Sequence, residues 1–189
     1  MITGFGPFEE VLENPAGRLA LRLEAHPPAG WAVRARELPV SFRRGPMALD
    51  ELLDGLSAHP DLLLALGAHE DPGFRLERGA RGSATGRPGR TDVDGVPATE
   101  LPGEPGDYRS SLPVDQLASA LRERTGVAAW VSDDAGGYVC ERVYHRLLRR
   151  GKKEGTPALF MHVPPFEHAS PERQERVLHA LLSDLGARL

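Results

Sequence analysis

The chain has little cysteine: one residue, Cys140, among 189. A lone cysteine cannot form an internal disulfide or a multi-cysteine metal site, so a disulfide-stapled secreted domain and a zinc module are excluded. The sequence also lacks a P-loop, a dinucleotide-binding glycine fingerprint and an HExxH motif. We therefore expect neither a cofactor nor a metal.

Long hydrophobic runs are missing as well. The longest are short, such as residues 62–66, and cannot span a bilayer. The N-terminal stretch MITGFGPF has no basic region followed by an apolar one, so no secretory signal is predicted. The 23 basic and 27 acidic residues give a net charge of -4, which does not favour nucleic-acid binding. The sequence predicts a cytoplasmic protein with no membrane or nucleic-acid partner.

The composition is that of an ordinary globular protein, with 40% hydrophobic and 26% charged residues. A chain of this length can bury a core as one domain, which we expect to span residues 1–189.

Short apolar runs alternate along the chain with helical patterns. Strands are predicted at 1–4, 31–40, 61–67, 74–77, 127–132 and 158–163, and helices at 15–26, 46–56, 113–125, 137–150 and from 171 onward. Gly151 is expected to end the fourth helix. This alternation predicts an α/β fold, a three-layer α/β/α sandwich of the phosphorylase/hydrolase-like kind around a mostly parallel sheet.

Residues 79–106 break this pattern, because they are rich in glycine and proline and too long for a plain connection. They are either a surface loop, with a hairpin around Asp94 and Gly95, or a lid over an active site.

Cys140 follows a predicted strand and a glycine-containing turn, which places it in the first turn of a helix. The helix dipole and free N–H groups there would lower the thiol pKa and favour a nucleophile. The alternative is that Cys140 is a small buried hydrophobic side chain.

A cysteine nucleophile needs a base and an acid that orients it. His162 is the best-placed histidine, at the carboxyl end of strand 158–163, and His69 also follows a strand. The residues alone leave five acids open as the third member: Glu70, Asp71, Glu77, Asp133 and Asp134.

Six segments in order resemble the pyroglutamyl peptidase type I family, also called pyrrolidone carboxyl peptidase, of which the chain looks like a divergent member. They are GFGPF with the following Asn14-Pro15, ELPVSF (37–42), FRLERGA (74–80), GEPGDYRSSLPV (103–114), SDDAGGYVC (132–140) and MHVP (161–164). The resemblance implies a cysteine peptidase that removes an N-terminal pyroglutamyl residue from peptides. It implies Cys140 as nucleophile, His162 as general base and Glu77 as orienting acid.

The same resemblance implies a substrate site. Phe5 and Phe8 would wall the pocket for the lactam ring, and flat aromatic walls suit a neutral ring. Arg87 would be the family's arginine, with Arg90 as an alternative. It further implies a homo-oligomer, often a tetramer.

Two departures bear on activity. Ala68 stands where the family usually has a glutamine of the lactam site. Glu141, after the cysteine, and the pair Asp133-Asp134 would raise the thiol pKa. They leave open a hydrolase of another small cyclic or N-blocked amide, or a non-catalytic binding protein on the same fold.

Overall fold

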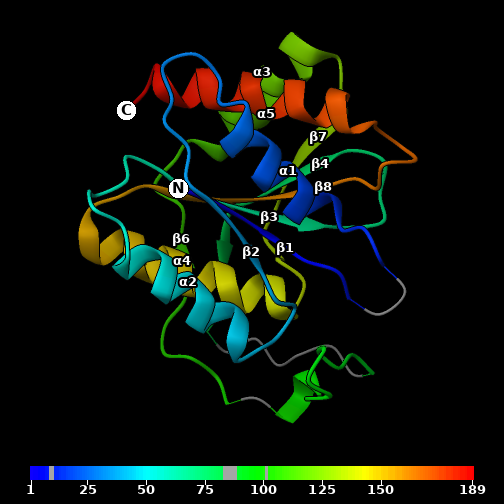
Figure 1. Ribbon diagram of the computed structural model, residues 1–189, viewed down its shortest axis with the longest axis vertical. Coiled ribbons are helices and arrows are strands. Elements are labelled where there is room, and N and C mark those ends of the chain that lie inside the picture. Colours follow the sequence, from blue (N-terminus) through cyan, green and yellow to red (C-terminus); the bar gives the residue numbers. More distant parts are fainter. Residues whose placement is uncertain (9–10, 83–88, 101) are drawn as a thin grey trace.

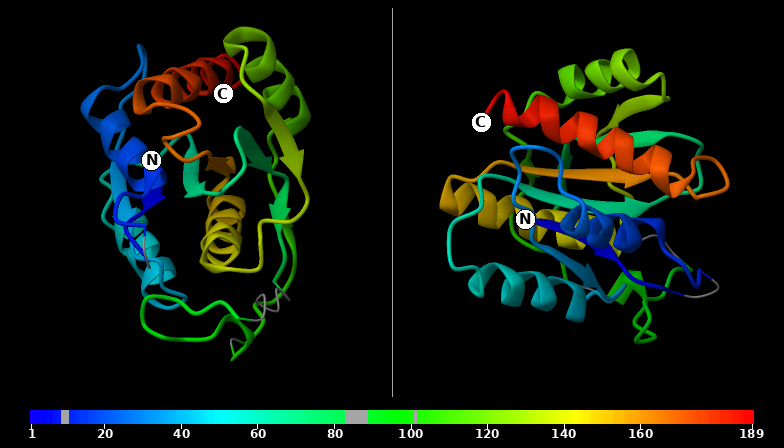
Figure 2. Two further views of the ribbon diagram at one scale, coloured as in Figure 1. Left: turned by 90° about the vertical axis from the view of Figure 1, so that its right-hand side faces the viewer. Right: turned by 45° about the horizontal axis from the view of Figure 1, so that its top comes forward.

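The fold is a six-stranded sheet between two helical layers. The computed structural model describes residues 1–8, 11–82, 89–100 and 102–189. In space the strands lie in the order β2-β1-β3-β8-β4-β7. Their bounds are β1 Ile2–Phe5, β2 Ala35–Leu38, β3 Leu63–Ala68, β4 Phe74–Glu77, β7 Ala129–Ser132 and β8 Ala158–Val163. The helices are α1 Pro15–Ala25, α2 Arg44–Asp54, α3 Val114–Thr125, α4 Val139–Glu154 and α5 Pro171–Gly186. Figures 1 and 2 show α1, α3 and α5 on one face of the sheet and α2 and α4 on the other.

The sheet is mostly parallel, as the alternation predicted. Only β4 and β8 pair in antiparallel fashion, and β7 runs parallel to β4. The strands β2, β1, β3 and β8 therefore run one way, while β4 and β7 run the other. The carboxyl ends of β4 and β8 therefore point to opposite ends of the sheet. A site that uses side chains of both strands lies over a face of the sheet and not beyond one end.

Local signals explain several helix boundaries. The side chain of Asn14 accepts a hydrogen bond from the backbone N–H of Ala16 at the start of α1, and Gly126 ends α3 with a φ of 66°. The prediction that Gly151 ends α4 is wrong. The helix ends at Gly155, which has a φ of 73°. Gly151 instead lies where a Cβ would be 2.5 Å from the Thr156 carbonyl oxygen, so it allows the helix to pack closely against the turn that follows it.

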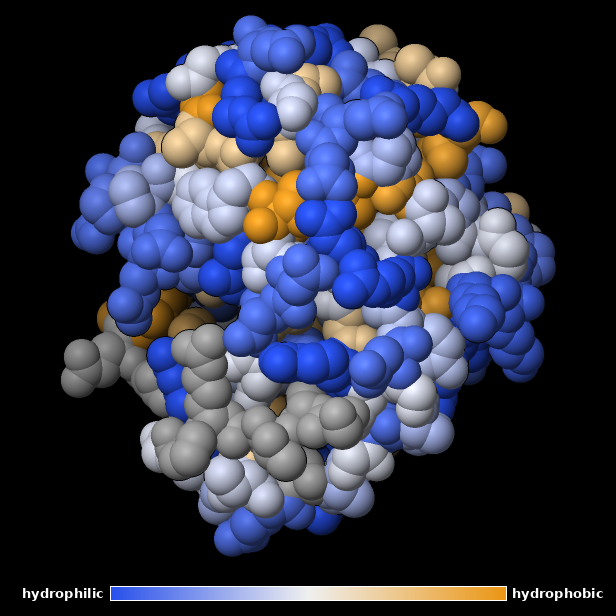
Figure 3. Space-filling view, turned by 180° about the vertical axis from the view of Figure 1, so that it is seen from behind, coloured by the Kyte–Doolittle hydropathy of each residue, from blue (hydrophilic) through white to orange (hydrophobic). Residues whose placement is uncertain are grey.

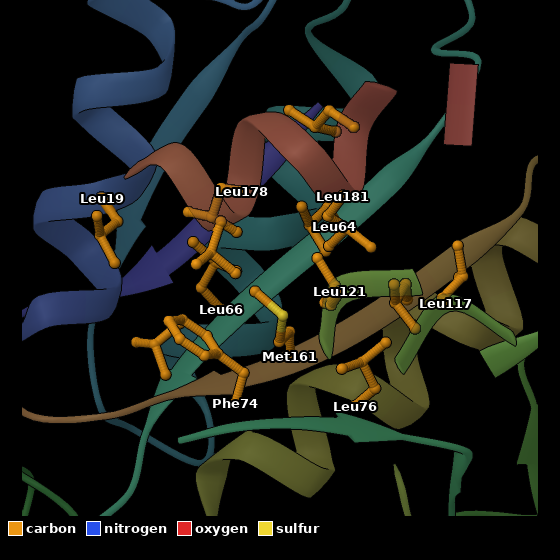
Figure 4. Packing of buried hydrophobic residues seen from close by; sticks show 14 of the residues in the cluster. Leu19, Leu64, Leu66, Phe74, Leu76, Leu117, Leu121, Met161, Leu178 and Leu181 are labelled. Carbon is orange, nitrogen blue, oxygen red and sulfur yellow. The ribbon is translucent and has the colours of Figure 1, made fainter. Parts of the chain in front are cut away.

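Two hydrophobic clusters fill the two faces of the sheet. Leu159, Met161 and Val163 of β8 belong to the first cluster, with side chains from α1, α3 and α5 (Figure 4). Ala158 and Phe160 belong to the second, with side chains from α2 and α4. This period-two alternation fixes which face every residue of β8 joins.

The long glycine- and proline-rich segment is held at both ends by a small ribbon. Strand β5 (Gly79–Ala80) pairs antiparallel with β6 (Tyr108–Arg109). Between them lies a 3-10 turn, η1 (Ala98–Glu100). The hairpin predicted around Asp94 and Gly95 is a tight turn closed by one isolated antiparallel bridge between Thr91 and Pro97, without flanking strands in the described residues 89–100. Asp92 donates its N–H to the Val96 carbonyl at 3.0 Å, and Gly95 has a φ of 76°.

Residues 91–98 dock against the β2–α2 connection, at the bottom of Figure 1. The buried Asp92 carboxylate accepts from the backbone N–H of Phe42 at 2.8 Å. Asp94 accepts from the Ser41 hydroxyl at 2.6 Å and from Arg44 at 3.0 Å. This part of the segment is therefore tied to the body of the protein.

Strand β2 is shorter than the predicted strand over 31–40, because only four of those residues pair with β1. The surface seen from behind is mostly hydrophilic, with apolar atoms gathered in its upper half (Figure 3). Within the described residues, no helix is both long and apolar enough to cross a membrane.

Candidate active site

Strands β4 and β8 bring a carboxylate, a guanidinium and an imidazole together. In their antiparallel pairing Arg75 lies opposite His162, and Glu77 lies opposite Phe160. Since side chains alternate along a strand, Arg75 and Glu77 point to the face that carries α4, while Leu76 points to the other. The local pattern of FRLE, polar and apolar in turn, thus aims two charged groups at the first turn of α4.

Glu77 lies within hydrogen-bond distance of His162. One oxygen of its carboxylate, Oε1, lies 2.7 Å from Nδ1 of the imidazole, and both side chains are almost entirely buried. With the proton on Nδ1, the ring donates to the carboxylate and its other nitrogen, Nε2, is free to accept a proton. Of the five acids left open by the residues, the geometry brings Glu77 to His162.

Arg75 holds the same carboxylate oxygen. Its Nε donates to Glu77 Oε1 at 2.7 Å, and its Nη2 lies 3.3 Å from Nδ1 of His162. The other carboxylate oxygen, Oε2, has no hydrogen-bond partner among the described residues. Sequence reasoning missed Arg75, although its position two residues before Glu77 on a strand was a usable signal.

Gly67 makes room for the imidazole. It pairs with His162 across β3 and β8. A Cβ at this position would lie 2.8 Å from the Phe160 ring and 3.0 Å from the His162 ring. The missing side chain of Gly67 therefore leaves room for both rings over β3, a role that sequence reasoning also missed.

Cys140 is the second residue of α4 and is partly exposed. Burial, followed by the charge of Glu77, raises the pKa of its thiol to about 12, while Arg75, a backbone hydrogen bond and Arg90 lower it. The predicted position in the first helical turn is confirmed, and a backbone hydrogen bond at Cys140 does lower the thiol pKa. Burial and the charge of Glu77 outweigh this effect, so the net shift is upward.

The environment of His162 also favours the neutral form of its imidazole. Burial lowers the pKa of its imidazole, and the charges of Arg75 and His69 lower it further, while Glu77 acts in the opposite direction. Near neutral pH the site therefore holds a thiol and a neutral imidazole, and a proton must leave Cys140 as its sulfur reacts.

Arginines neutralise the acids that flank Cys140. Glu141 is buried and accepts from the backbone N–H and the Nε of Arg81, each at 3.0 Å, and from the backbone N–H of Gly137 at 2.7 Å. Asp133 lies 3.2 Å from Arg78. The carboxylate among the main influences on the Cys140 pKa is Glu77, and the effect of the acids next to the cysteine stays a prediction. Their charges hold the turn before α4.

The predicted aromatic walls lie in or against one cluster. Phe5 is part of the second hydrophobic cluster, and Phe8 and Cys140 pack against it. Arg87 lies outside the described residues. Arg90 is described: its guanidinium lies 5.7 Å from the centre of the Tyr138 ring, and its charge acts on Cys140.

Other predicted candidates lie nearby with different partners. Ala68 is the last residue of β3. The His69 ring lies 5.8 Å from the His162 ring, and its Nε2 is 2.9 Å from the Gly73 carbonyl. Within the described ranges, no group of three or more His, Cys, Asp and Glu side chains is arranged to hold a metal ion.

Comparisons with known proteins agree in sequence and in structure. A family model described as pyroglutamyl peptidase matches residues 1–176. The pyrrolidone-carboxylate peptidase of Streptomyces coelicolor is 40% identical over 150 residues, covering 78% of this chain and 68% of that protein. The one from Chromobacterium violaceum is 36% identical over 167 residues, covering 87% and 76%.

Solved structures of pyrrolidone carboxyl peptidases share the fold of this chain over nearly its whole length. A mutant pyrrolidone carboxyl peptidase from Pyrococcus furiosus superposes with a TM-score of 0.86 at 26% identity, covering 100% of this chain and 98% of that one. The corresponding enzyme from Fervidobacterium islandicum superposes with a TM-score of 0.83 at 27% identity, covering 98% and 97%.

Proposed function

The chain belongs to the pyroglutamyl peptidase family of cysteine peptidases, and we propose that it removes N-terminal pyroglutamate from peptides through Cys140, His162 and Glu77. The 2.7 Å contact between Glu77 and Nδ1 of His162 carries this assignment of residues. It fixes the imidazole with Nε2 unprotonated, which is the form that a thiol nucleophile requires.

In the proposed mechanism, Nε2 of His162 takes the thiol proton as the Cys140 sulfur attacks the pyroglutamyl carbonyl carbon. The backbone N–H of Cys140 stabilises the negative charge on the carbonyl oxygen. The imidazolium, paired with Glu77, then gives its proton to the leaving amine as the C–N bond breaks. A water molecule, deprotonated by Nε2, attacks the thioester and releases pyroglutamate, and the sulfur regains its proton.

For the substrate site, we propose that Phe5 and Phe8 wall the lactam pocket, since both belong to or pack against the cluster that Cys140 contacts. Arg87 stays the predicted family arginine. Arg90 has one supporting observation, the effect of its charge on Cys140. Parallel measurements of kcat/KM for Arg87→Ala and Arg90→Ala decide between them: the functional arginine loses at least tenfold, and the other changes little.

We also propose that the chain forms one domain spanning 1–189, and that the described part of the segment 79–106 covers this site. The docked part, 91–98, contacts Tyr138, which lies two residues before Cys140 and whose hydroxyl donates to the Thr91 carbonyl at 2.6 Å. Limited proteolysis in this segment should slow when a pyroglutamyl aldehyde occupies the site. Equal cleavage with and without the aldehyde would contradict a lid.

The family resemblance supports two further proposals, a homotetramer and a cytoplasmic location. A reducing cytoplasm keeps a lone thiol such as Cys140 reduced, which favours this location. Light scattering on the purified protein tests the tetramer, with a mass of about four chains expected. Fractionation of cells that express the protein tests the location, with activity expected in the cytoplasmic fraction.

The decisive test is turnover of pyroglutamyl-aminomethylcoumarin by the reduced protein, with Cys140→Ser in parallel. We expect release of the fluorophore by the native protein and none by the variant. Release by both would remove Cys140 from the mechanism. A folded native protein that cleaves another cyclic or N-blocked amide but not this substrate would show altered specificity, with Ala68 as the first residue to examine.

A further inference from the structure

The Glu77 carboxylate is buried where a lone negative charge is costly. Its side chain is fully buried, and its described hydrogen-bond partners, Arg75 and His162, both use Oε1. An ionised carboxylate out of water needs a counter-charge or several donors. A neutral imidazole supplies one donor and no charge, so Arg75 is the described group that supplies the positive charge.

The geometry also shows a competition at His162. With Nδ1 protonated, the imidazole donates to Glu77, and Nη2 of Arg75, 3.3 Å away, cannot donate to the same nitrogen. With Nδ1 bare, Arg75 could donate to it, but the ring proton would then sit on Nε2 and block proton acceptance from Cys140. The Nε hydrogen bond of Arg75 to Oε1 keeps the carboxylate at 2.7 Å from Nδ1, which favours the first state.

We propose that Arg75 is a positioning residue of the hydrolytic site, which holds Glu77 against His162 and moves the working range of the Cys140–His162 pair to lower pH. The inference rests on the proposed roles of these three residues. Arg75 acts through Glu77 and through its charge, without touching the substrate.

The direction of the charge effect follows from the groups around the imidazole. From β4, Glu77 favours the charged ring and Arg75 disfavours it, and His69, beyond the end of β3, also disfavours it. From α4, the Tyr144 hydroxyl donates to the Glu77 backbone carbonyl at 3.0 Å. The Cys140 thiol, also on α4, has its pKa raised by the charge of Glu77 and lowered by the charge of Arg75. A positive charge lowers the pKa of thiol and imidazolium alike, so its removal raises both.

Two variants separate charge from hydrogen bonding. Arg75→Gln keeps a donor without the charge, and Arg75→Lys keeps the charge with a single ammonium group. Arg146→Gln is the matched control, because Arg146 also pairs with a carboxylate, Asp50 at 2.5 Å, on the same face of the sheet but away from Glu77. Each protein is assayed for kcat/KM against pH with pyroglutamyl-aminomethylcoumarin, and for alkylation of Cys140 by iodoacetamide at pH 8.5.

For Arg75→Gln we expect the acid limb of kcat/KM to move up by about half to one pH unit. Alkylation of Cys140 should slow by about three- to tenfold, because less thiolate is present. Arg75→Lys and Arg146→Gln should leave the acid limb within about 0.2 units of the native position. A merely structural role would lower activity without moving the limb.

The proposal is overturned if the acid limb of the kcat/KM profile does not move in Arg75→Gln. It is also overturned if this limb moves by the same amount in Arg75→Lys. If Arg75→Gln does not fold, the Arg75→Lys profile still decides, because the retained charge must retain the limb. Alkylation needs no turnover, so it tests Arg75 even if the native protein cleaves no pyroglutamyl substrate. Failure of the native protein to cleave a pyroglutamyl substrate would count against the proposed function and not against the role of Arg75.

Discussion

The two faces of the central sheet differ in one place. On the face that carries α1, α3 and α5, the strands present only apolar side chains near β4 and β8, such as Leu76 and Met161. On the opposite face the same two strands present Arg75, Glu77 and His162. Neighbouring residues of one strand therefore lie in an apolar core and in the proposed active site. Single substitutions on β4 or β8 should separate effects on stability from effects on turnover.

The largest expected effect falls on the face that carries the proposed triad. Glu77→Gln keeps the size of the side chain but removes the charge that fixes the Nδ1-protonated imidazole. We expect kcat to fall by about 10³- to 10⁴-fold with the fold retained. Glu141→Gln is the matched control, because Glu141 is also buried and paired with an arginine. It should retain kcat within about tenfold; a similar collapse in both variants would mean that any buried charge change disrupts this face.

The next effect concerns the rate at which the Cys140 thiol is alkylated, which its raised pKa should lower. A thiol with a pKa of about 12 stays protonated at neutral pH. Iodoacetamide should therefore modify Cys140 about a thousandfold more slowly than a free peptide thiol at pH 7, with the rate rising about tenfold per pH unit up to pH 9. A rate independent of pH between 6 and 9 would indicate a preformed thiolate–imidazolium pair instead.

On the apolar face, Leu76→Ala should affect stability and spare chemistry. Leu76 is fully buried in the first cluster, and the cavity should cost about 2–5 kcal/mol of unfolding free energy. Denaturant unfolding measures the loss, and kcat at a temperature where the variant is folded should stay within about twofold. Met161→Leu, which conserves volume, should cost less than about 1.5 kcal/mol. A large fall of kcat in Leu76→Ala would show that the two faces are coupled.

Gly67→Ala should affect both properties modestly. The added Cβ would meet the rings of Phe160 and His162 at 2.8 and 3.0 Å, and Phe160 is fully buried. We expect a loss of about 1–3 kcal/mol from overpacking and about a tenfold fall in kcat/KM as the imidazole shifts. Ala65→Gly, two residues earlier on the same face, should lower stability without changing kcat. Equal kinetics in both variants would remove the steric role of Gly67.

Much of this arrangement was predictable from sequence. The apolar run before His162 and the glycine turn before Cys140 placed both residues correctly, because strand period and helix entry are local properties. The choice of Glu77 came from the family resemblance, since spacing cannot show which acid a neighbouring strand brings near. The antiparallel pairing of β4 with β8, and with it the contact of Arg75 with Glu77, depends on sheet topology. The thiol pKa depends on burial, which also has no local sequence signal.

The smallest expected effect concerns the acids next to the cysteine. Asp133 is exposed and lies near Arg78 and Arg109, so solvent and arginines screen its charge from the thiol. Asp133→Asn should therefore change kcat/KM by less than about twofold between pH 6 and 8. Its matched comparison is Glu77→Gln, a carboxylate-to-amide change in the buried pair. A clear shift of the Asp133→Asn profile to lower pH would mean that a surface charge does reach Cys140. Burial alone would then not explain why Glu77 affects the thiol more than Asp133 does.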